Sequence, residues 1–420
     1  NKESHTPFLD SLINEGVYFN NTFSPTDGTA ISLNCMLNSK FQFQTGIRAQ
    51  KIILLEDNHL QKLKNSGYYI SGLIPKLTSL KPITDYFQNE NHTYDPGPPP
   101  ETLTTGMTEK ISFLLNSLKN ISPWFCYLHL FDLHPVKEGK KPLKIEEFQS
   151  EKFGNTLYEQ TASSIDHWLK KISAQINFDD TLLIITSDHG ERIPFKDKSS
   201  FKFEPKFNSA TNIGRSVLPK STHNLGGKVM GKLKRTIGKT KLNYSNKDLT
   251  PYQKRSRDPH FTLSLHDELL HIPFLLKGLT LPSKIISNQI STLDFFPTIF
   301  ELVGIMQNNT KYSSSLVPLI NNQPMTEKAI FLHTIPYEKE SPLDKIGMRT
   351  SKYKYFRNSK NPKKDVHLYD LENDPYENNN ISKNNLPIIE KMEKLLRDMQ
   401  NDTLELDNTL SKEEEEKISK

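Results

Sequence analysis

The chain has 420 residues, a net charge of +5 and an isoelectric point near 8.8. Hydrophobic residues make up 35% of it and the mean hydropathy is −0.60, so a sizeable core is compatible with a polar surface, in one large domain or two. The small positive excess is too weak to indicate a nucleic-acid partner. The two cysteines, Cys35 and Cys126, exclude a disulfide framework and a cysteine-based zinc site.

No apolar run in the sequence approaches the length that spans a bilayer, and no signal peptide is visible. The first residue is Asn1 rather than Met, and a helix-like stretch follows directly. We therefore expect an upstream segment, with any targeting signal or membrane anchor, to be missing from this sequence.

Apolar strand-like stretches alternate with amphipathic helical stretches from the first residues onward. A helix over Pro7–Asn14 precedes the first strand, and a helix over Thr156–Ile176 precedes the fourth. The predicted strands are Val17–Phe23, Tyr68–Ile74, Trp124–Phe131, Thr181–Thr186 and Ile272–Lys277. Such alternation predicts an α/β fold, namely a three-layer sandwich with a central, largely parallel sheet.

The character of the sequence changes after residue 305. The stretches "EKAIFLHTIPY", "GMRTSKYKYFRN" and "DVHLYDLEN" are short strand candidates with turn residues between them, and a helix over Asn385–Met399 follows. They predict a small antiparallel sheet. We expect a large domain over residues 1–305, a C-terminal α+β subdomain over 306–400 and a charged, solvated tail over 401–420.

One segment of the large domain, residues 192–259, lacks helical or strand periodicity. It holds 17 Lys and Arg against 4 acidic residues. Its composition is typical of a disordered, solvated insertion. The alternative is an electropositive flap that attracts an anionic substrate or a membrane surface.

The stretch "TLLIITSDHGER", residues 181–192, joins a buried strand to an acid, an imidazole and a glycine. In open α/β sheets, ligands bind at the carboxyl ends of the strands. Asp188 and His189 offer a carboxylate oxygen and an imidazole nitrogen there, which suit zinc or manganese. The alternative is an ordinary loop, since Ser-Asp is common turn chemistry and Gly190 permits a sharp bend.

A second strand end carries the stretch "SPTDGTAISLNCML", residues 24–37. A helix is expected over Thr29–Leu37, with Thr29 in its first turn. The free N–H groups and the positive end of the helix dipole would stabilise negative charge on a nucleophilic oxygen at this position. The structural alternative is that Thr29 or Thr26 caps the helix.

Histidines follow two more strand candidates. His134 comes after Trp124–Phe131 in "YLHLFDLHP", and His260 and His266 precede Ile272–Lys277 in "DPHFTLSLHDELLHIPF". A lone histidine is more often a satisfied surface or core residue than a ligand. Their recurrence at corresponding strand ends favours a shared site.

Together these stretches resemble the sulfatase branch of the alkaline phosphatase superfamily. "TPFLDSLINEGVYFNNTFSPT" resembles that family's elements before its nucleophile, "YLHLFDLHP" its substrate motif and "SDHGE" its metal motif. "LHDELLHIPFLLKG" with "ISTLDFFPTIFELVGI" resembles its next strand–helix unit. "MRTSKYKYFRN" followed by "LYDLENDPYENNNIS" resembles its C-terminal subdomain, so the resemblance covers nearly the whole chain.

The resemblance implies a sulfatase-like catalytic domain over residues 1–305 and a role for each candidate residue. Thr29 matches the nucleophile, and Asp188 and His189 match ligands of a divalent metal, whether zinc, manganese or calcium. His134 matches the histidine that contacts the transferred group. The two other candidate substrate contacts are His260 and His266, of which His260 is also assigned a catalytic role.

The nucleophile segment departs from the ordinary sulfatase pattern Cys-x-Pro-Ser-Arg, whose Cys becomes formylglycine. Here the matching residues are Thr29-Ala30-Ile31-Ser32-Leu33, and Cys35 is too far along to substitute. "TAISLNCM" instead resembles the threonine segment of phosphoethanolamine transferases. The acidic metal ligand that the family places before its first helix is absent from this sequence.

The sequence thus predicts a metal-dependent, sulfatase-like hydrolase of phosphate or sulfate esters with a threonine nucleophile. Its substrate would be an anionic ester of a glycan, lipid or small molecule, and no nucleic acid is expected. By resemblance its location is extracytoplasmic. The alternatives are a membrane-associated phosphoethanolamine or phosphoglycerol transferase, or a catalytically silent anion-binding protein with the same fold.

Overall fold

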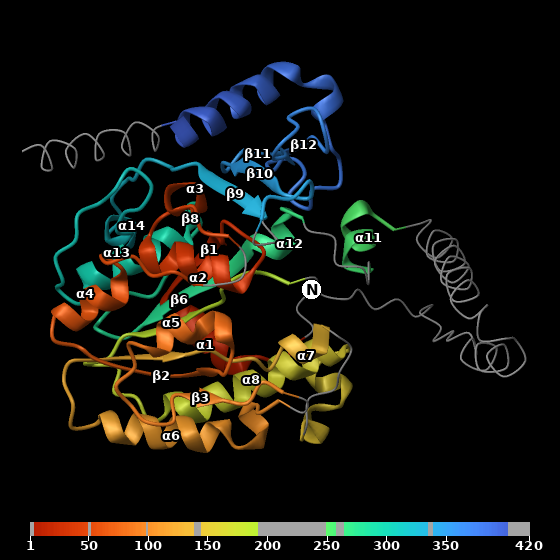
Figure 1. Ribbon diagram of the computed structural model, residues 1–420. Coiled ribbons are helices and arrows are strands. Elements are labelled where there is room, and N and C mark those ends of the chain that lie inside the picture. Colours follow the sequence, from red (N-terminus) through yellow and green to blue (C-terminus); the bar gives the residue numbers. More distant parts are fainter. Residues whose placement is uncertain are drawn as a thin grey trace, which may run out of the picture. The chain divides into compact units, whose positions relative to one another are not determined.

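The computed structural model describes residues 4–48, 52–97, 100–137, 144–191, 249–257, 264–334 and 339–401 (Figure 1). The chain divides into two compact units. The larger unit comprises residues 1–193 and 261–420, and the smaller one comprises residues 194–260. In the smaller unit the described part is the helix α11 (Pro251–Arg257) with the two residues before it. Of the predicted insertion at residues 192–259, the structure describes only residues 249–257, and the rest lies outside the described residues.

A five-stranded sheet forms the centre of the larger unit. Its strands are β1 (Val17–Phe23), β5 (Leu183–Thr186), β6 (His271–Lys277), β7 (Lys284–Ile286) and β8 (Ile290–Ser291), in the order β5-β6-β1-β7 with β8 also on β1. β1 runs parallel to β7 and β8 and antiparallel to β6, which is also antiparallel to β5. The carboxyl ends of β1 and β5 therefore lie at the same edge of the sheet.

A second sheet holds the order β3-β2-β4, with β3 (Thr93–Tyr94), β2 (Tyr69–Pro75) and β4 (Trp124–Leu128) all parallel. Side chains of β2 alternate between two hydrophobic clusters. Ile70 and Ile74 join the cluster that contains residues of α2, α4, α13 and β6, while Leu73 joins the one that contains residues of α6 and α8. Helices therefore cover both faces, which gives the three layers (Figure 1).

The helices of the larger unit are mostly short. Among them, α8 (Leu157–Ser173) begins with a capping box in which the Thr156 hydroxyl accepts from Glu159 N at 3.2 Å and the Glu159 carboxylate accepts from Thr156 N at 2.8 Å. The α-helices are α1 (Pro7–Glu15), α2 (Thr29–Asn38), α3 (Gln42–Thr45), α4 (His59–Asn65), α5 (Lys81–Thr84), α6 (Met107–Leu118), α7 (His134–Lys137), α8 (Leu157–Ser173), α12 (Asp267–Leu270), α13 (Phe295–Leu302) and α14 (Val317–Ile320).

The C-terminal part forms a separate antiparallel sheet of four strands in the order β12-β11-β10-β9. Its strands are β9 (Ile330–Thr334), β10 (Lys345–Arg349), β11 (Tyr353–Asn358) and β12 (His367–Asp370). A helix over residues 386–401 follows, and its buried Met392 and Leu396 belong to the same hydrophobic cluster as the sheet.

The predicted fold class is confirmed: the chain is α/β, with parallel strands in its central layer and a separate antiparallel C-terminal sheet. Within the central layer, β6 is the exception to the expected parallel arrangement. Its first half begins beside the end of β5, where the Gly190 amide donates to Leu269 O at 2.8 Å. Because the chain returns at the edge where it left, β6 must run back along β5.

Candidate functional site

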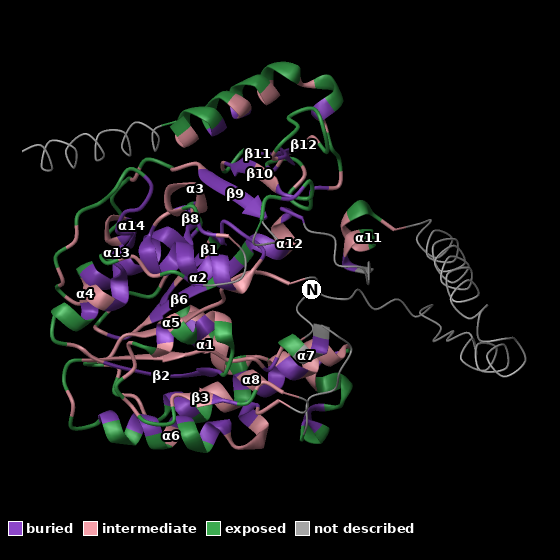
Figure 2. Cartoon of the chain, viewed as in Figure 1, coloured by how far each residue is buried: buried purple, intermediate pink, exposed green. Residues whose placement is uncertain are grey.

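Thr29 lies at the start of α2, the helix that follows β1 through a five-residue turn. The N-cap is Gly28, in an extended conformation and without a side-chain cap, so neither Thr26 nor Thr29 fills that position. Every residue of α2 after Thr29 is buried, and the helix is drawn largely in purple (Figure 2), whereas Thr29 itself is only partly buried. The fold therefore fixes the helix in the core and leaves its first hydroxyl at the edge of the sheet.

The structure brings Thr29, Asp188 and His189 together from positions about 160 residues apart. The Thr29 Oγ1 atom lies 3.3 Å from His189 Nε2, and the Thr29 side chain is close enough to the Asp188 carboxylate to lower the pKa of that acid. His189 Nε2 and Asp188 Oδ2 are 3.6 Å apart. These two side chains keep 19% and 18% of their surface exposed, so a ligand can reach them.

The hydrogen bond made by His189 Nδ1 determines whether Nε2, the nitrogen that faces Thr29, carries a proton or a lone pair. His189 Nδ1 lies 2.7 Å from Gly190 O. A carbonyl oxygen can only accept, so Nδ1 carries the proton and donates it. In the neutral ring, Nε2 then holds a lone pair directed at the Thr29 hydroxyl. An imidazole that donates its other N–H to a backbone carbonyl is the usual arrangement of a metal-binding histidine.

Asp188 is held as a carboxylate by its neighbours. Burial raises its pKa, but the nearby side chains of His189, His129 and Thr29 together outweigh burial, so the pKa lies below its usual value. The Ser32 hydroxyl, one turn along α2, donates to the backbone carbonyl of Asp188. α2 thus contacts this loop through both Thr29 and Ser32.

His129 is a candidate that the sequence reasoning missed. It directly follows the end of β4, and its Nδ1 lies 3.0 Å from the Tyr127 hydroxyl. Burial lowers the pKa of His129, and the negative charge of Asp188 acts in the opposite direction. The expected strand ran to Phe131, whereas β4 ends at Leu128. The strand-end rule would have selected His129 had the boundary been known.

Asp27 is the second candidate that was missed, because the stretch "SPTDG" was interpreted only as a turn. Its side chain is buried, and its Oδ2 accepts from Ser264 N at 3.5 Å. Burial raises its pKa, while the nearby His189 lowers it. Asp27 therefore belongs to the surroundings of this site. It lies two residues before Thr29, and it is close enough to His189 for the histidine to lower its pKa.

The three other predicted histidines have different surroundings. His134 is exposed at the start of α7, where its ring stacks on Phe131 with 4.2 Å between centroids. His266 is buried, bonded to Ser264 Oγ through Nδ1 and to the Tyr369 hydroxyl at 3.1 Å through Nε2. His260 lies outside the described residues. Contacts of these histidines with a substrate stay predictions.

Neither cysteine is suited to be the nucleophile in place of Thr29. Cys35 lies in the middle of α2 with 1% of its surface exposed, and burial raises its pKa to about 12. Burial likewise raises the pKa of Cys126 to about 11. Thiols with such pKa values remain protonated and unreactive at neutral pH.

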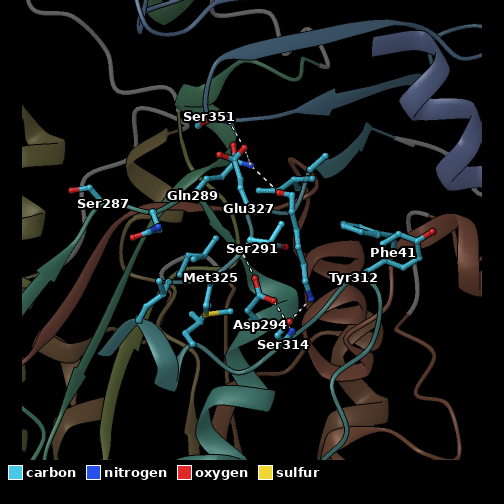
Figure 3. A pocket seen from close by; sticks show the side chains of 18 residues that line it. Phe41, Ser287, Gln289, Ser291, Asp294, Tyr312, Ser314, Met325, Glu327 and Ser351 are labelled. Atoms are coloured by element: carbon cyan, nitrogen blue, oxygen red, sulfur yellow. Dashed lines mark hydrogen bonds between the residues drawn. The ribbon is translucent and has the colours of Figure 1, made fainter. Parts of the chain in front are cut away.

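A cavity of about 250 Å³ lies near the C-terminal end of α2, where β8 approaches β9. Figure 3 shows the Asp294 carboxylate inside its lining, where it accepts from the amides of Ser291 at 3.0 Å and Ser314 at 2.9 Å. Burial raises the pKa of Asp294 to about 6. The lining does not include Thr29, Asp188 or His189, so this cavity is separate from the candidate site.

Asp188 and His189 form a pair rather than a full set of metal ligands. The described residues contain no group of three or more His, Cys, Asp and Glu side chains arranged to hold a metal ion. Among the helices in the described part of the chain, none is long and apolar enough to cross a membrane.

Comparison with known protein families establishes the family to which this chain belongs. Residues 1–305 match the family model described as Sulfatase. The chain belongs to the sulfatase family. Residues 262–403 of this sulfatase-family chain also match the model described as N-sulphoglucosamine sulphohydrolase, C-terminal. The resemblance stated from the sequence motifs is thereby confirmed, while the likeness of the threonine segment to phosphoethanolamine transferases stays a prediction.

Individual relatives are distant. Arylsulfatase K of Mus musculus is 24% identical over 148 residues, which cover 34% of this chain and 27% of the relative. Arylsulfatase K of Rattus norvegicus is 25% identical over 129 residues, 29% of this chain and 23% of the relative. The chain thus matches about a quarter of the length of these curated relatives.

Solved structures share the fold over nearly the whole of this sulfatase-family chain. The phosphonate monoester hydrolase of Agrobacterium radiobacter has a TM-score of 0.63 at 14% identity, with coverage of 96% of this chain and 92% of the other. A 2-O GAG sulfatase has a TM-score of 0.62 at 15% identity, with coverage of 95% and 87%. At these identities the likeness establishes the fold.

Proposed function

We propose that this chain is a metal-dependent hydrolase of phosphate or sulfate esters with Thr29 as its nucleophile. The observation that carries the proposal is the convergence of Thr29 Oγ1 and His189 Nε2 at 3.3 Å, with Asp188 Oδ2 3.6 Å from the same nitrogen. Membership of the sulfatase family supports ester hydrolysis as the class of reaction. The first turn of α2 supplies the positive end of a helix dipole at the reacting oxygen.

The residues around Thr29 fit a divalent metal by their chemistry. Asp188 offers a carboxylate oxygen, His189 a lone pair on Nε2 and Thr29 a hydroxyl oxygen, a mixed oxygen and nitrogen set that suits zinc or manganese. The bond from His189 Nδ1 to Gly190 O supports the same role. When bound, such a metal would lower the pKa of the Thr29 hydroxyl and neutralise charge on the ester oxygens.

The chain's own residues then account for the remaining steps. Thr29 Oγ1 loses its proton to solvent and bonds to the phosphorus or sulfur atom as the bond to the leaving-group oxygen breaks. That oxygen takes up a proton, for which His134 and His260 are the proposed donors. Water then attacks the ester on Thr29, which releases the phosphate or sulfate and restores the hydroxyl. The N–H groups in the first turn of α2 stabilise the negative oxygens during both steps.

The nature of the nucleophile favours phosphoryl over sulfuryl chemistry. A threonine ester is stable and must be hydrolysed, whereas a hemiacetal of the kind formed by formylglycine collapses by itself. The solved structures that share the fold include both a phosphonate monoester hydrolase and a 2-O GAG sulfatase. The proposed substrate is therefore an anionic ester, either phosphorylated or sulfated, of a glycan, lipid or small molecule.

A phosphotransferase is the second candidate, favoured by one observation. Thr29-Ala30-Ile31-Ser32 occupies the position of the sulfatase Cys-x-Pro-Ser pattern, and threonine forms a phospho-intermediate that an acceptor alcohol can resolve as well as water. Hydrolase and transferase share every step up to that intermediate. They differ only in the group that attacks it.

The first experiment is elemental analysis of the purified protein, as wild type and as Asp188→Ala. We expect stoichiometric zinc or manganese in the wild type and its loss in the variant. Hydrolysis of aryl phosphate, phosphodiester and sulfate esters then identifies the preferred bond, and adding an acceptor alcohol distinguishes transfer from hydrolysis. A folded wild type that binds no divalent metal, even when supplied with it, would contradict the proposal.

A further inference from the structure

A buried network of four charged side chains joins the C-terminal sheet to α12. Asp267, the first residue of α12, accepts from Arg349 of β10 at 2.9 Å and from Lys354 of β11 at 2.6 Å. Lys354 has no exposed surface and also contacts Glu377 at 2.8 Å. Glu377 accepts from the backbone N–H of Asp267 at 2.7 Å. Two cationic and two acidic side chains therefore meet inside the fold, with Asp267 at the centre, and burial raises the pKa of Glu377 to about 7.

α12 in turn holds both loops of the candidate site through its backbone. Leu269 O accepts from Gly190 N at 2.8 Å, directly after His189. Leu270 O accepts from Ser24 N, also at 2.8 Å, in the turn that leads to Thr29. Two neighbouring carbonyls of one short helix thus hold the two chain segments whose side chains meet at the proposed nucleophile.

The packing between α12 and the metal-motif loop leaves no room for adjustment. A Cβ at Gly190 would lie 2.6 Å from Glu268 O and 2.9 Å from the carbonyl carbon of Leu269. Such close contact with backbone means that a shift of α12 displaces Gly190 and the adjoining His189. Arg349 also lies over the ring of Phe23, with its guanidinium carbon 3.4 Å from the ring centroid, at the end of β1.

We propose that Asp267 is a positioning residue for the reaction, through which the cations of the C-terminal sheet set the position of His189 relative to Thr29. A helix of four residues has little stability of its own, so its place depends on what binds it. The ion pairs of Asp267 fix the position of α12, and the backbone hydrogen bonds of α12 fix the positions of Gly190 and Ser24. This inference rests on the function proposed above.

The test compares Asp267→Asn with Glu393→Gln in the full chain. The Arg357–Glu393 pair, at 2.6 Å, is a partly buried ion pair of the same C-terminal sheet, but it bonds the 386–401 helix instead of α12. Both variants break an ion pair of this sheet, and only Asp267→Asn releases α12. Circular dichroism first establishes that each variant is folded.

The first measurement is amide hydrogen exchange at Gly190 and Ser24 in the metal-free protein. We expect Asp267→Asn to accelerate exchange at both amides by roughly tenfold or more, and Glu393→Gln to leave them unchanged. Exchange that stays at the wild-type rate in Asp267→Asn overturns the proposal. Equal acceleration in both variants also overturns it, since that indicates general destabilisation.

The second measurement is the dissociation constant for zinc or manganese, by calorimetry. Supporting residues around a metal site typically change affinity by about 10–100-fold when they are replaced, and we expect a loss of that size in Asp267→Asn alone. Should Asp267→Asn fail to fold, Arg349→Lys takes its place under the same criteria. A wild type without metal would contradict the proposed function, and hydrogen exchange would still decide whether Asp267 positions the two loops.

Discussion

The hydroxyl of Thr29 is the atom on which the proposed chemistry depends. Replacing Thr29 with Ala removes the oxygen that faces His189 Nε2 at 3.3 Å and leaves the buried remainder of α2 in place. We expect kcat to fall by at least about 1,000-fold, as for other enzymes that lose their nucleophile. Ester hydrolysis under saturating substrate measures the effect.

Thr29→Ser is the matched control, because it keeps the hydroxyl and removes only a methyl group. It should retain activity far above that of Thr29→Ala and should form the same covalent intermediate, detectable by intact-protein mass spectrometry. Equal activity of Thr29→Ala and wild type would exclude Thr29 as the nucleophile.

His129 is expected to support the reaction through Asp188. It bonds the Tyr127 hydroxyl at 3.0 Å, and its charge influences the pKa of Asp188. We expect His129→Gln to lower kcat/KM by roughly 10–100-fold, in the range seen when a supporting partner of a metal ligand is lost. His92→Gln, which changes a histidine near the end of the neighbouring β2, serves as control. Unchanged kcat/KM in His129→Gln would show that the site does not depend on it.

Single residues also show what the sequence could and could not predict. Thr29, Asp188 and His189 were found because buried strands end just before them, a pattern that a linear sequence displays. His129 was missed because strand boundaries depend on hydrogen bonds to neighbours, and a three-residue error placed it inside a strand. Asp27 was missed because its burial results from packing against a segment more than 200 residues away.

Among the secondary-structure elements, the direction of β6 could not be predicted from the local pattern of apolar residues. β6 has the same continuous apolar character that the sequence analysis attributed to parallel strands. Its reversed direction follows from where the chain re-enters the sheet after β5, which is a property of the connection. The pairing of β10 with β11 was predictable because only residues 350–352 join them, and so short a connection leaves an antiparallel pairing as the simple outcome.

The helix over residues 386–401 contributes to the fold through one apolar face. Leu396 has no exposed surface and belongs to the cluster beneath the C-terminal sheet, whereas its neighbour Leu395 is 37% exposed. We expect Leu396→Ala to reduce the free energy of unfolding by about 2–5 kcal/mol. Leu395→Ala on the same helix should change it by less than about 0.5 kcal/mol. Urea denaturation measures both, and equal losses would contradict the assigned face.

For the molecule as a whole, we expect buried neutral histidines to make stability depend on pH. His59 of α4 stacks on Phe296, and its Nε2 bonds Ser39 Oγ at 2.7 Å. Burial lowers its pKa from 6.5 to about 3. Between these values the unfolded chain binds a proton that the folded chain does not, so acid favours unfolding. This histidine alone should contribute a loss of about 1.4 kcal/mol per pH unit over that window.

The contribution of His59 is isolated by comparison with His59→Phe, which keeps an aromatic ring against Phe296 and cannot titrate. Other groups, including the acid Asp294 with its pKa raised to about 6, act equally in both proteins and cancel in the difference. The free energy of unfolding should fall more steeply in the wild type as pH decreases from 6.5 to 4. Parallel curves would show that His59 is protonated in the folded protein.

The hydrogen bond between Gly190 N and Leu269 O joins the two ends of a long chain segment. Every residue between these two belongs to a closed loop whose ends are already fixed 2.8 Å apart. The entropy cost of such a closure grows only with the logarithm of its length, so a loop of about 80 residues costs about 2.5 kcal/mol more than one of about five. The length of the segment between Gly190 and Leu269 can therefore vary widely between homologous chains with only a small change in the free energy of unfolding.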